Sequence, residues 1–345
     1  MARKRVTLAD VAARSGMSIA AASMILNGRP DTRLSQDAHD RVHAAARELG
    51  YRPNVAARGL RTAKTHTIGF VSDIVATTRF ASGLIRGALS AAEAAGHVVL
   101  VAETGGEPAR EQEAIEALLD RQVDGIIFAT MRARELFLPE LPEGTEAVML
   151  NATNPRYTRS VLPDEEAGGR AAVQLLVDAG HREGIVLIGQ NDEVERDVFR
   201  SATIARRVAG IRGALAAHGL AFAREESIWV WEPENGYDAV RTLLGDGIRP
   251  RALLCMNDRL AFGAYQALGE SGMRIPDEVS IVSFDNDEVA SYLRPGLSTV
   301  GLPHEEMGRA AVELLLSGDG SPREMLIPMP VISRASISTP ASAPS

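Results

Sequence analysis

The chain has 345 residues, which is too long for one small domain and long enough for an N-terminal segment followed by a two-lobed body. Residues 1–64 carry 12 Lys or Arg and five Asp or Glu, a net charge of +7, whereas the rest carries −15. A basic arm on an acidic body restricts contact with nucleic acid to the arm. The N-terminus lacks an apolar core of signal-peptide length, and no apolar run could cross a bilayer, so we expect a soluble, cytoplasmic protein.

The first helices are predicted from their end signals. Thr7-Leu8-Ala9-Asp10 has the form of a capping box, and Gly16 supplies the left-handed residue that ends a helix. Ser18 caps a second helix only two residues later, and this helix runs to Leu26. Two short helices joined so tightly must cross at a large angle. This is the helix-turn-helix arrangement, which presents its second helix to a DNA major groove.

A third helix and a short segment follow. The third helix begins after Ser35 and ends at Gly50. The next residues, Tyr51-Arg52-Pro53-Asn54, are predicted to be extended, because a proline disfavours the helical region for the residue before it. Asn54 can cap one more helical segment at 55–60. So short a helix is unstable alone in water, because a stable isolated helix needs roughly 12–15 residues.

Beyond residue 64, Val- and Ile-rich runs of strand length alternate with amphipathic helical stretches. The strands are expected at Ile68–Val71, Val98–Ala102, Gly125–Ala129, Ala147–Leu150, Ile185–Gly189, Ile228–Trp231, Ala252–Met256 and Val279–Phe284. The helices are expected at Gly83–Ala95, Glu111–Arg121, Ala167–Ala179, Val208–His218 and Leu260–Gly272. This alternation predicts an α/β body with parallel sheets and helices on both faces, in two lobes that divide near Pro163-Asp164.

The N-terminal motifs carry a family resemblance. The combination T-L-A-D-V-A, G-M-S, S-x-x-L-N-G and L-G-Y-R-P-N-x-x-A-R-x-L, within residues 7–60, resembles the lactose-repressor-like (LacI/GalR) family of bacterial transcription regulators. The resemblance covers nearly the whole chain. It implies a helical helix-turn-helix headpiece and a two-lobed, periplasmic-binding-protein-like body that binds an effector and dimerises. The implied divisions are a headpiece at 1–52, a hinge helix and linker at 53–64, the body at 65–338 and a disordered tail at 339–345.

The family's three crossovers between lobes define the expected lobe boundaries. They would fall near 161–163, 289–293 and 321–325. The first lobe would therefore take residues 65–162 and 292–322, and the second would take 163–291 and 323–338.

The resemblance places base contacts on the second helix. Ile19 and Ala20 would face base edges, together with the later position Met24. Here Met24 stands where relatives often have Arg, and Ala21 replaces a frequent Thr. A bidentate contact with guanine is therefore excluded at Met24, and contact with thymine methyl groups is favoured. The alternative is that Ile19 and Met24 pack inside the headpiece.

Other DNA contacts are expected from polar, basic and hinge residues. Phosphate contacts are predicted for Ser18, Ser23, Asn27 and Arg33, and Arg3, Lys4 and Arg5 could add salt-dependent affinity. Leu60 matches the family's apolar wedge, which enters the minor groove and kinks the duplex. The remaining matches to the family's DNA contacts are Thr7, Tyr51, Asn54, Ala57 and Arg58. The alternative is that residues 55–60 form an ordinary linker.

A small ligand is expected in the body, at the carboxyl ends of the strands. The predicted ligand-binding residues are Asp73, Thr78, Phe80, Asn151, Arg207, Trp231, Asn257 and Asp285. Their amide, carboxylate and guanidinium groups around an aromatic face suit a sugar. Alternatively, Asp258 caps the helix that begins there and Trp231 is a core residue. Residues 73–80 depart from the family's frequent D-I-x-N-P-F-F, so the resemblance does not specify which ligand binds.

Two rival functions are disfavoured. The chain lacks G-x-G-x-x-G after a strand, G-x-x-x-x-G-K-[ST] and G-x-S-x-G, and His304-Glu305-Glu306-Met307 departs from H-E-x-x-H, so we expect neither an enzyme nor a catalytic residue. The lone Cys255 is expected in the core, and no metal or cofactor is expected. A secreted sugar-binding protein would lack the headpiece.

The sequence therefore predicts a ligand-controlled regulator, most simply a repressor responding to a sugar. Its expected partners are a near-palindromic stretch of double-stranded DNA, a carbohydrate effector and a second copy of the chain, with no membrane. The absence of a heptad-bearing tail favours a dimer over a tetramer. Whether the effector induces or corepresses stays open.

Overall fold

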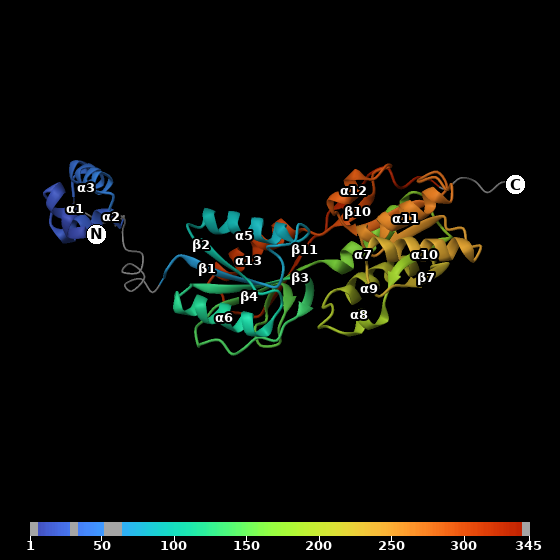
Figure 1. The fold of residues 1–345 in the computed structure, drawn as a ribbon, viewed down its shortest axis with the longest axis horizontal. Helices are drawn as coiled ribbons and strands as arrows, with labels where there is room; N and C mark the ends of the chain where they lie inside the picture. Colours follow the sequence, from blue (N-terminus) through green and yellow to red (C-terminus); the bar gives the residue numbers. More distant parts are fainter. Residues whose placement is uncertain (1–5, 28–33, 52–63, 340–345) are drawn as a thin grey trace. The chain divides into compact units, whose positions relative to one another are not determined.

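The computed structural model describes residues 6–27, 34–51 and 64–339. The chain forms two compact units, Met1–Thr65 and His66–Ser345. The second unit holds two sheets, and each sheet is the centre of one lobe (Figure 1).

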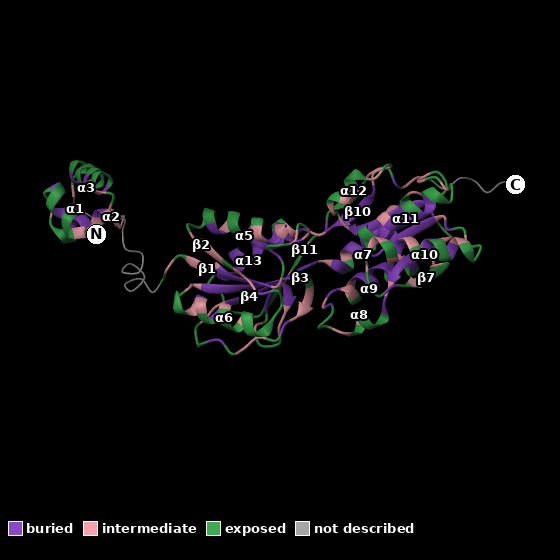
Figure 2. Cartoon of the chain, in the orientation of Figure 1, coloured by how far each residue is buried: buried purple, intermediate pink, exposed green. Residues whose placement is uncertain are grey.

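The described residues of the first unit form three helices around an apolar core of their own. They are α1 (Leu8–Ser15), α2 (Ile19–Leu26) and α3 (Gln36–Leu49). Val11, Ile25 and Val42 are almost completely buried between them, which gives this small unit an internal reason to fold. The buried segments of its helices are purple in Figure 2.

The first lobe is a parallel six-stranded sheet in the order β11-β5-β4-β3-β1-β2. Its strands are β1 (Thr67–Ser72), β2 (Val98–Glu103), β3 (Gly125–Glu135), β4 (Ala147–Thr153), β5 (Arg159–Pro163) and β11 (Arg323–Ile327). Its helices are α5 (Ser82–Ala94), α6 (Pro108–Asp120) and α13 (His304–Leu316). Ile127 packs in the core under α5 and α13, whereas its neighbour Phe128 packs in the core under α6. Because successive strand residues point to opposite faces, helices cover both faces of this sheet.

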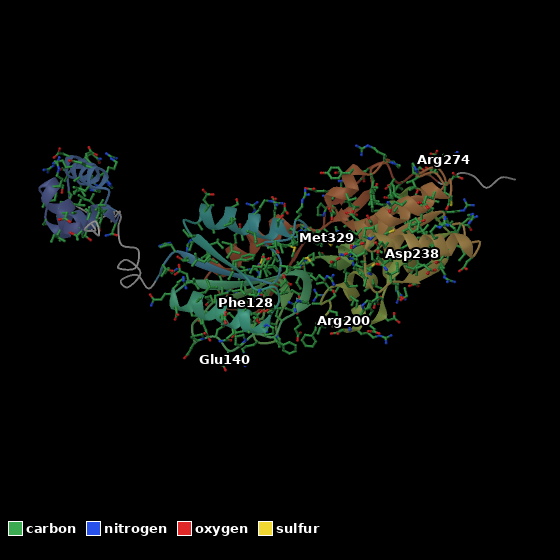
Figure 3. All side chains as sticks on the ribbon, viewed as in Figure 1. Phe128, Glu140, Arg200, Asp238, Arg274 and Met329 are labelled. Atoms are coloured by element: carbon green, nitrogen blue, oxygen red, sulfur yellow. The ribbon has the colours of Figure 1, made fainter. Side chains whose placement is uncertain are left out.

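The second lobe is a six-stranded sheet in the order β12-β10-β9-β8-β6-β7, with only β12 antiparallel to its neighbour. Its strands are β6 (Ile185–Gln190), β7 (Arg224–Ser227), β8 (Ala252–Cys255), β9 (Ser280–Asp285), β10 (Ser298–Gly301) and β12 (Val331–Ile332). Its helices are α7 (Glu165–Asp178), α8 (Asp192–Arg196), α9 (Ile204–Ala217), α10 (Pro233–Gly245), α11 (Asp258–Glu270) and α12 (Glu288–Tyr292). Met329, just before β12, belongs to the apolar core of this lobe (Figure 3).

Strand pairing corrects two of the expected crossovers. Residues 298–301 pair in parallel with β9, so the chain remains in the second lobe until 302–303 instead of leaving it near 289–293. Residues 323–327 pair with β5, so the last crossover lies at 328–330 and not at 321–325. The first crossover follows Pro163. Residues 292–301 therefore lie in the second lobe, and residues 323–327 lie in the first.

One expected strand is also displaced. The sequence predicts a strand at Ile228–Trp231, but the structure has β7 at Arg224–Ser227 and irregular backbone after it. β7 is an outermost strand that pairs only with β6. An edge strand can contain charged residues, because one side of it faces solvent. The apolar run at Ile228–Trp231 therefore does not mark the position of this strand.

Glycines allow the helix pair α7–α9 to pack closely. A Cβ atom on Gly210 would lie 2.1 Å from the carbonyl oxygen of Glu166, and one on Gly169 would lie 2.3 Å from the carbonyl oxygen of Arg207. Real Cβ atoms do not approach oxygen so closely. The two glycines therefore bring the backbone of Arg207 against the start of α7.

We predict that Gly210→Ala destabilises the body, whereas Gly213→Ala on the same helix does not. A Cβ atom at Gly213 meets nothing within 4 Å. The first change should lower the free energy of unfolding by about 2 kcal/mol through overpacking. The second should raise it by about 0.5–1 kcal/mol, because alanine suits a helix better than glycine. Urea unfolding followed by circular dichroism measures both, and equal midpoints would contradict the close-packing argument.

Candidate functional site

Helix α2 presents an apolar outer surface. Ile19 is 54% exposed and Ala20 is exposed, whereas Ala21, Ala22 and Ile25 are buried in the headpiece core. The alternative in which Ile19 packs inside the headpiece is therefore wrong. Met24 is half-buried. The two positions predicted to face base edges at the start of α2 are available to a partner.

The polar residues of this region also order its helices. The Ser18 hydroxyl accepts a hydrogen bond from the Ala21 amide at 3.1 Å and caps α2. The Asn27 side-chain amide donates to the Ser23 carbonyl oxygen at 2.7 Å and closes the same helix. Thr7 forms the predicted capping box with Asp10.

Tyr51 packs partly against the headpiece core. Eight other residues predicted to contribute to DNA binding lie outside the described residues, namely Arg3, Lys4, Arg5, Arg33, Asn54, Ala57, Arg58 and Leu60.

In the body, Arg207 is the centre of a buried cluster in the second lobe. Its guanidinium donates to both carboxylate oxygens of Glu165, at 2.7 and 2.8 Å, and to the Met256 carbonyl oxygen at 2.7 Å. The guanidinium also lies over the Phe284 ring, 4.3 Å from its centroid. Arg207 is only 2% exposed. The guanidinium can be buried so completely because the Glu165 carboxylate pairs with it through two hydrogen bonds.

Asp285 lies beside this cluster at the end of β9. Its Oδ1 is 3.9 Å from Nη2 of Arg207, and its backbone has a φ of +103°. Burial raises the pKa of Asp285 to about 8, and the attraction of Arg207 offsets this only in part. At neutral pH its carboxyl group is therefore largely protonated and able to donate a hydrogen bond as well as accept one.

The helix α11 is capped by Asn257, whereas the alternative considered above assigned the cap to Asp258. Asn257 caps α11, because its Oδ1 accepts from the Leu260 amide at 2.8 Å, and its Nδ2 donates to the Trp231 carbonyl oxygen at 3.2 Å. Asp258 is not the cap. It is fully buried and accepts from the Asp287 amide at 2.7 Å, which fixes the loop after β9. Burial raises its pKa to about 6.

Trp231 has a buried hydrogen-bond donor with no partner. Its ring packs partly against the core of the second lobe, as the core alternative proposed. Its indole Nε1, however, is buried and makes no hydrogen bond to any described residue. An unsatisfied buried donor is rare in native structures and calls for a ligand or a bound water.

In the first lobe, the side chains of Asp73 and Asn151 form hydrogen bonds with the backbone of β3. Asp73 Oδ1 accepts from the amides of Ile74 and Met131, at 2.6 and 3.0 Å, and its other oxygen lies 3.6 Å from Nη2 of Arg134. Asn151, at a φ of +52°, donates to the carbonyl oxygens of Thr130 and Met131, at 3.0 and 3.1 Å. Both predicted residues therefore shape the strand ends.

Thr78 and Phe80 belong to the segment after β1. Thr78 is half-buried, and its amide closes a turn on the Ile74 carbonyl oxygen at 3.1 Å. The Phe80 ring meets the His304 ring edge to face at a centroid distance of 5.1 Å. Burial lowers the pKa of His304 to about 4, so its imidazole is neutral, and its Nε2 has no partner among the described residues.

Hydrogen bonds and an ion pair thus bring six of the eight predicted ligand-binding residues into two groups, and leave Thr78 and Phe80 outside both. Arg207, Trp231, Asn257 and Asp285 gather at the strand ends of the second lobe, and Asp73 and Asn151 meet at Met131 in the first. Sequence reasoning missed Glu165. The signal available for it was a carboxylate directly after the predicted lobe division at Pro163-Asp164. It faces the helix that holds Arg207 and Gly210, which form an R-x-x-G motif.

The comparisons with known proteins agree with this architecture. Residues 7–54 match the model of bacterial regulatory proteins of the lacI family, and residues 173–337 match a periplasmic binding protein-like domain. The HTH-type transcriptional regulator AscG of Escherichia coli K12 is 34% identical over 92% of this chain and 94% of its own length. The chain belongs to the LacI family. The ribose operon repressor of the same organism is 31% identical over 90% of this chain and 92% of its own.

Solved structures show the same LacI-family fold over the whole chain. A lac repressor dimer bound to operator and the anti-inducer ONPF has a TM-score of 0.76 at 26% identity, covering 97% of this chain and all of that one. A complex of the transcriptional regulator CelR with cellobiose has a TM-score of 0.60 at 25% identity, covering 96% and 100%. This LacI-family member is a DNA-binding transcriptional regulator of the kind controlled by a small-molecule effector.

None of the described helices has the length and apolar character needed to span a membrane. Within the part of the chain that the structure describes, no group of three or more His, Cys, Asp or Glu side chains could hold a metal ion. Cys255 is buried, and burial raises the pKa of its thiol far above the ordinary value.

We predict that Asp285 makes the stability of the effector-free protein depend on pH. Its pKa in the folded state, about 8, lies above the ordinary value of 3.8. The stabilising effect of the protonated group is therefore complete below pH 3.8 and is lost as the pH rises to about 8. Asp285→Asn should remove this loss, so that the variant gains stability relative to wild type between pH 5 and 8.

The measurement is urea unfolding at a series of pH values in that window. The matched control is Asp238→Asn, since Asp238 is exposed on α10 (Figure 3). This variant should follow the wild-type profile. A constant difference between Asp285→Asn and wild type at every pH would contradict the assignment.

Proposed function

We propose that this regulator is a homodimeric repressor whose affinity for a near-palindromic operator is controlled by a sugar bound between its lobes. The observation that carries the proposal is the pairing of two features in one LacI-family chain. One is the exposed Ile19–Ala20 surface of α2, and the other is the cluster of predicted ligand residues with an unpartnered Trp231 donor.

The DNA-reading part of the proposal assigns α2 to the major groove. Ile19 and Ala20 would contact thymine methyl groups, and Met24 would remove the guanine preference that an Arg at that position supplies. Residues 53–64 would form the hinge helix and linker. A second copy would supply the symmetric headpiece that a near-palindromic operator requires, consistent with the operator-bound lac repressor dimer.

The effector part assigns the sugar hydroxyls to Asp285, Arg207 and the Trp231 indole. The hydroxyl groups of a neutral polyol both donate and accept hydrogen bonds. They therefore fit a protonated carboxyl group, which can do the same, together with the N–H donors of an indole and a guanidinium. The aromatic face of Trp231 fits the C–H face of a sugar ring. The ribose operon repressors and the CelR–cellobiose complex support this ligand class.

The same comparisons support a regulator that has no catalytic activity. The relatives are transcriptional regulators. We infer that this chain has no enzymatic activity and that it acts in the cytoplasm, where its DNA lies.

The first test is thermal unfolding of the full chain against a panel that includes ribose, cellobiose and nucleobases. A ligand that binds only the folded state stabilises it by about 2.7 kcal/mol at 100 times its dissociation constant. The expected hit is a sugar. A hit confined to nucleobases would overturn the sugar assignment and leave the regulator intact.

We predict that Leu60→Ala lowers operator affinity by about tenfold or more, which corresponds to about 1.4 kcal/mol. The apolar wedge that opens a base step would be lost. Operator affinity is measured by fluorescence anisotropy at fixed salt, and the thermal shift caused by the panel hit should be unchanged. Wild-type operator affinity would exclude the wedge.

We predict that Asp285→Ala abolishes the thermal response to the panel hit while operator affinity without ligand stays near wild type. Asp285 lies in the body and is far in sequence from the headpiece helices. The same anisotropy assay checks the second outcome. A retained thermal response would remove Asp285 from the effector site.

A further inference from the structure

The strand β3 extends past β1, whose pairing with it ends at Ala129, while its last residues still pair with β4. Its register with β4 shifts between Ala129 and Arg134, after which it continues to Glu135. This extension meets the connection between β6 and α9 in the other lobe. The Glu135 amide donates to the Val198 carbonyl oxygen at 2.8 Å, and the Ala202 amide donates to the Ala133 carbonyl oxygen at 2.8 Å. Two backbone hydrogen bonds in opposite directions therefore join the lobes.

An aromatic pair lies beside these bonds. The rings of Phe137 in the first lobe and Phe199 in the second are stacked, with centroids 4.5 Å apart and an interplanar angle of 13°. Phe137 is nevertheless 78% exposed and Phe199 is 41% exposed. Exposure of an apolar ring to water is unfavourable. Stacking of the two rings on each other offsets part of this cost, which explains why both are placed here.

The loop in the second lobe is itself held in shape. The Asp197 carboxylate accepts from the Phe199 amide at 3.0 Å and from Nε of Arg200 at 3.1 Å. The Arg200 guanidinium lies over the Trp229 ring, 4.3 Å from its centroid. Figure 3 labels Arg200 on the part of the second lobe near α8. The loop therefore presents Val198 and Phe199 to the first lobe as a preformed surface.

Strand order places this contact away from the covalent crossovers. The crossovers leave from β5, β10 and β11, near one edge of each sheet. The contact instead joins β3 to the chain after β6, which lies next to the opposite edge of the second sheet. The lobes are thus tied on a second side.

We propose that residues 133–137 and 197–202 form a clasp that holds the two lobes closed and that must part for the lobes to open. This inference deepens the proposed function, because the clasp would set the rate at which an effector enters and leaves the site between the lobes. Two hydrogen bonds and one exposed ring pair are few and weak enough to break and reform reversibly.

The experiment measures the distance between spin labels on the two lobes of the full chain by pulsed electron spin resonance. The labels are attached at Glu140→Cys and Arg196→Cys, whose native side chains are each 82% exposed. The native Cys255 is buried and stays unlabelled. Dilution with unlabelled chain removes distances between copies. Neither effector nor DNA is added, so the result does not depend on the proposed function.

The expected result is a single short distance in the unaltered background and a longer, broader population after Phe137→Ala with Phe199→Ala. The matched control, Phe137→Tyr with Phe199→Tyr, keeps the stacked rings and should keep the short distance. Ala202→Pro removes one backbone donor while leaving the rings, and should also lengthen the distance. Unchanged distributions in both disruptive variants would overturn the clasp. Because the two rings are exposed, thermal unfolding of the double alanine variant should stay close to that of its parent.

Discussion

The buried ion pair between Arg207 and Glu165 is the constraint on which the second lobe depends. Glu165 opens α7 directly after the first crossover, and Arg207 lies 42 residues later on α9. Neither charge could be buried alone, because an unpaired charge inside a protein costs several kcal/mol. The pair therefore fixes the point where the chain enters this lobe against the helix that carries R-x-x-G. The glycine of that motif allows the approach that the arginine needs.

The same pair organises the chemistry at the strand ends. Arg207 also binds the Met256 carbonyl oxygen, next to the Asn257 cap, and lies near Asp285. Its charge is largely neutralised by Glu165, so Asp285 remains in surroundings that disfavour a second carboxylate. A site built in this way favours a neutral, hydrogen-bonding ligand over an anion, because an anion would add a second negative charge beside Glu165.

The sequence was a good guide wherever the signal was local. The caps at Thr7, Ser18 and Gly50 and the alternation of strands with helices are short-range patterns, and the structure has them. The crossovers were misplaced because β10 and β11 are short, and the exposed β11 lacks the apolar run by which a buried strand is recognised. The position of Glu165 after the lobe division is a local signal, but its pairing with Arg207, like that of Phe199 with Phe137, leaves no mark in the spacing of residues. Such pairings exist only once the chain has folded.

The headpiece folds around Val11, Ile25 and Val42, and its apolar core contains no residue of the body. The outer surface of α2 contributes nothing to that core. Substitutions at Ile19 or Ala20 can therefore accumulate without weakening either unit. After gene duplication, one copy could acquire a new operator while keeping its effector, or a new effector while keeping its operator. Because the two units have separate cores, effector specificity and operator specificity can change independently in evolution.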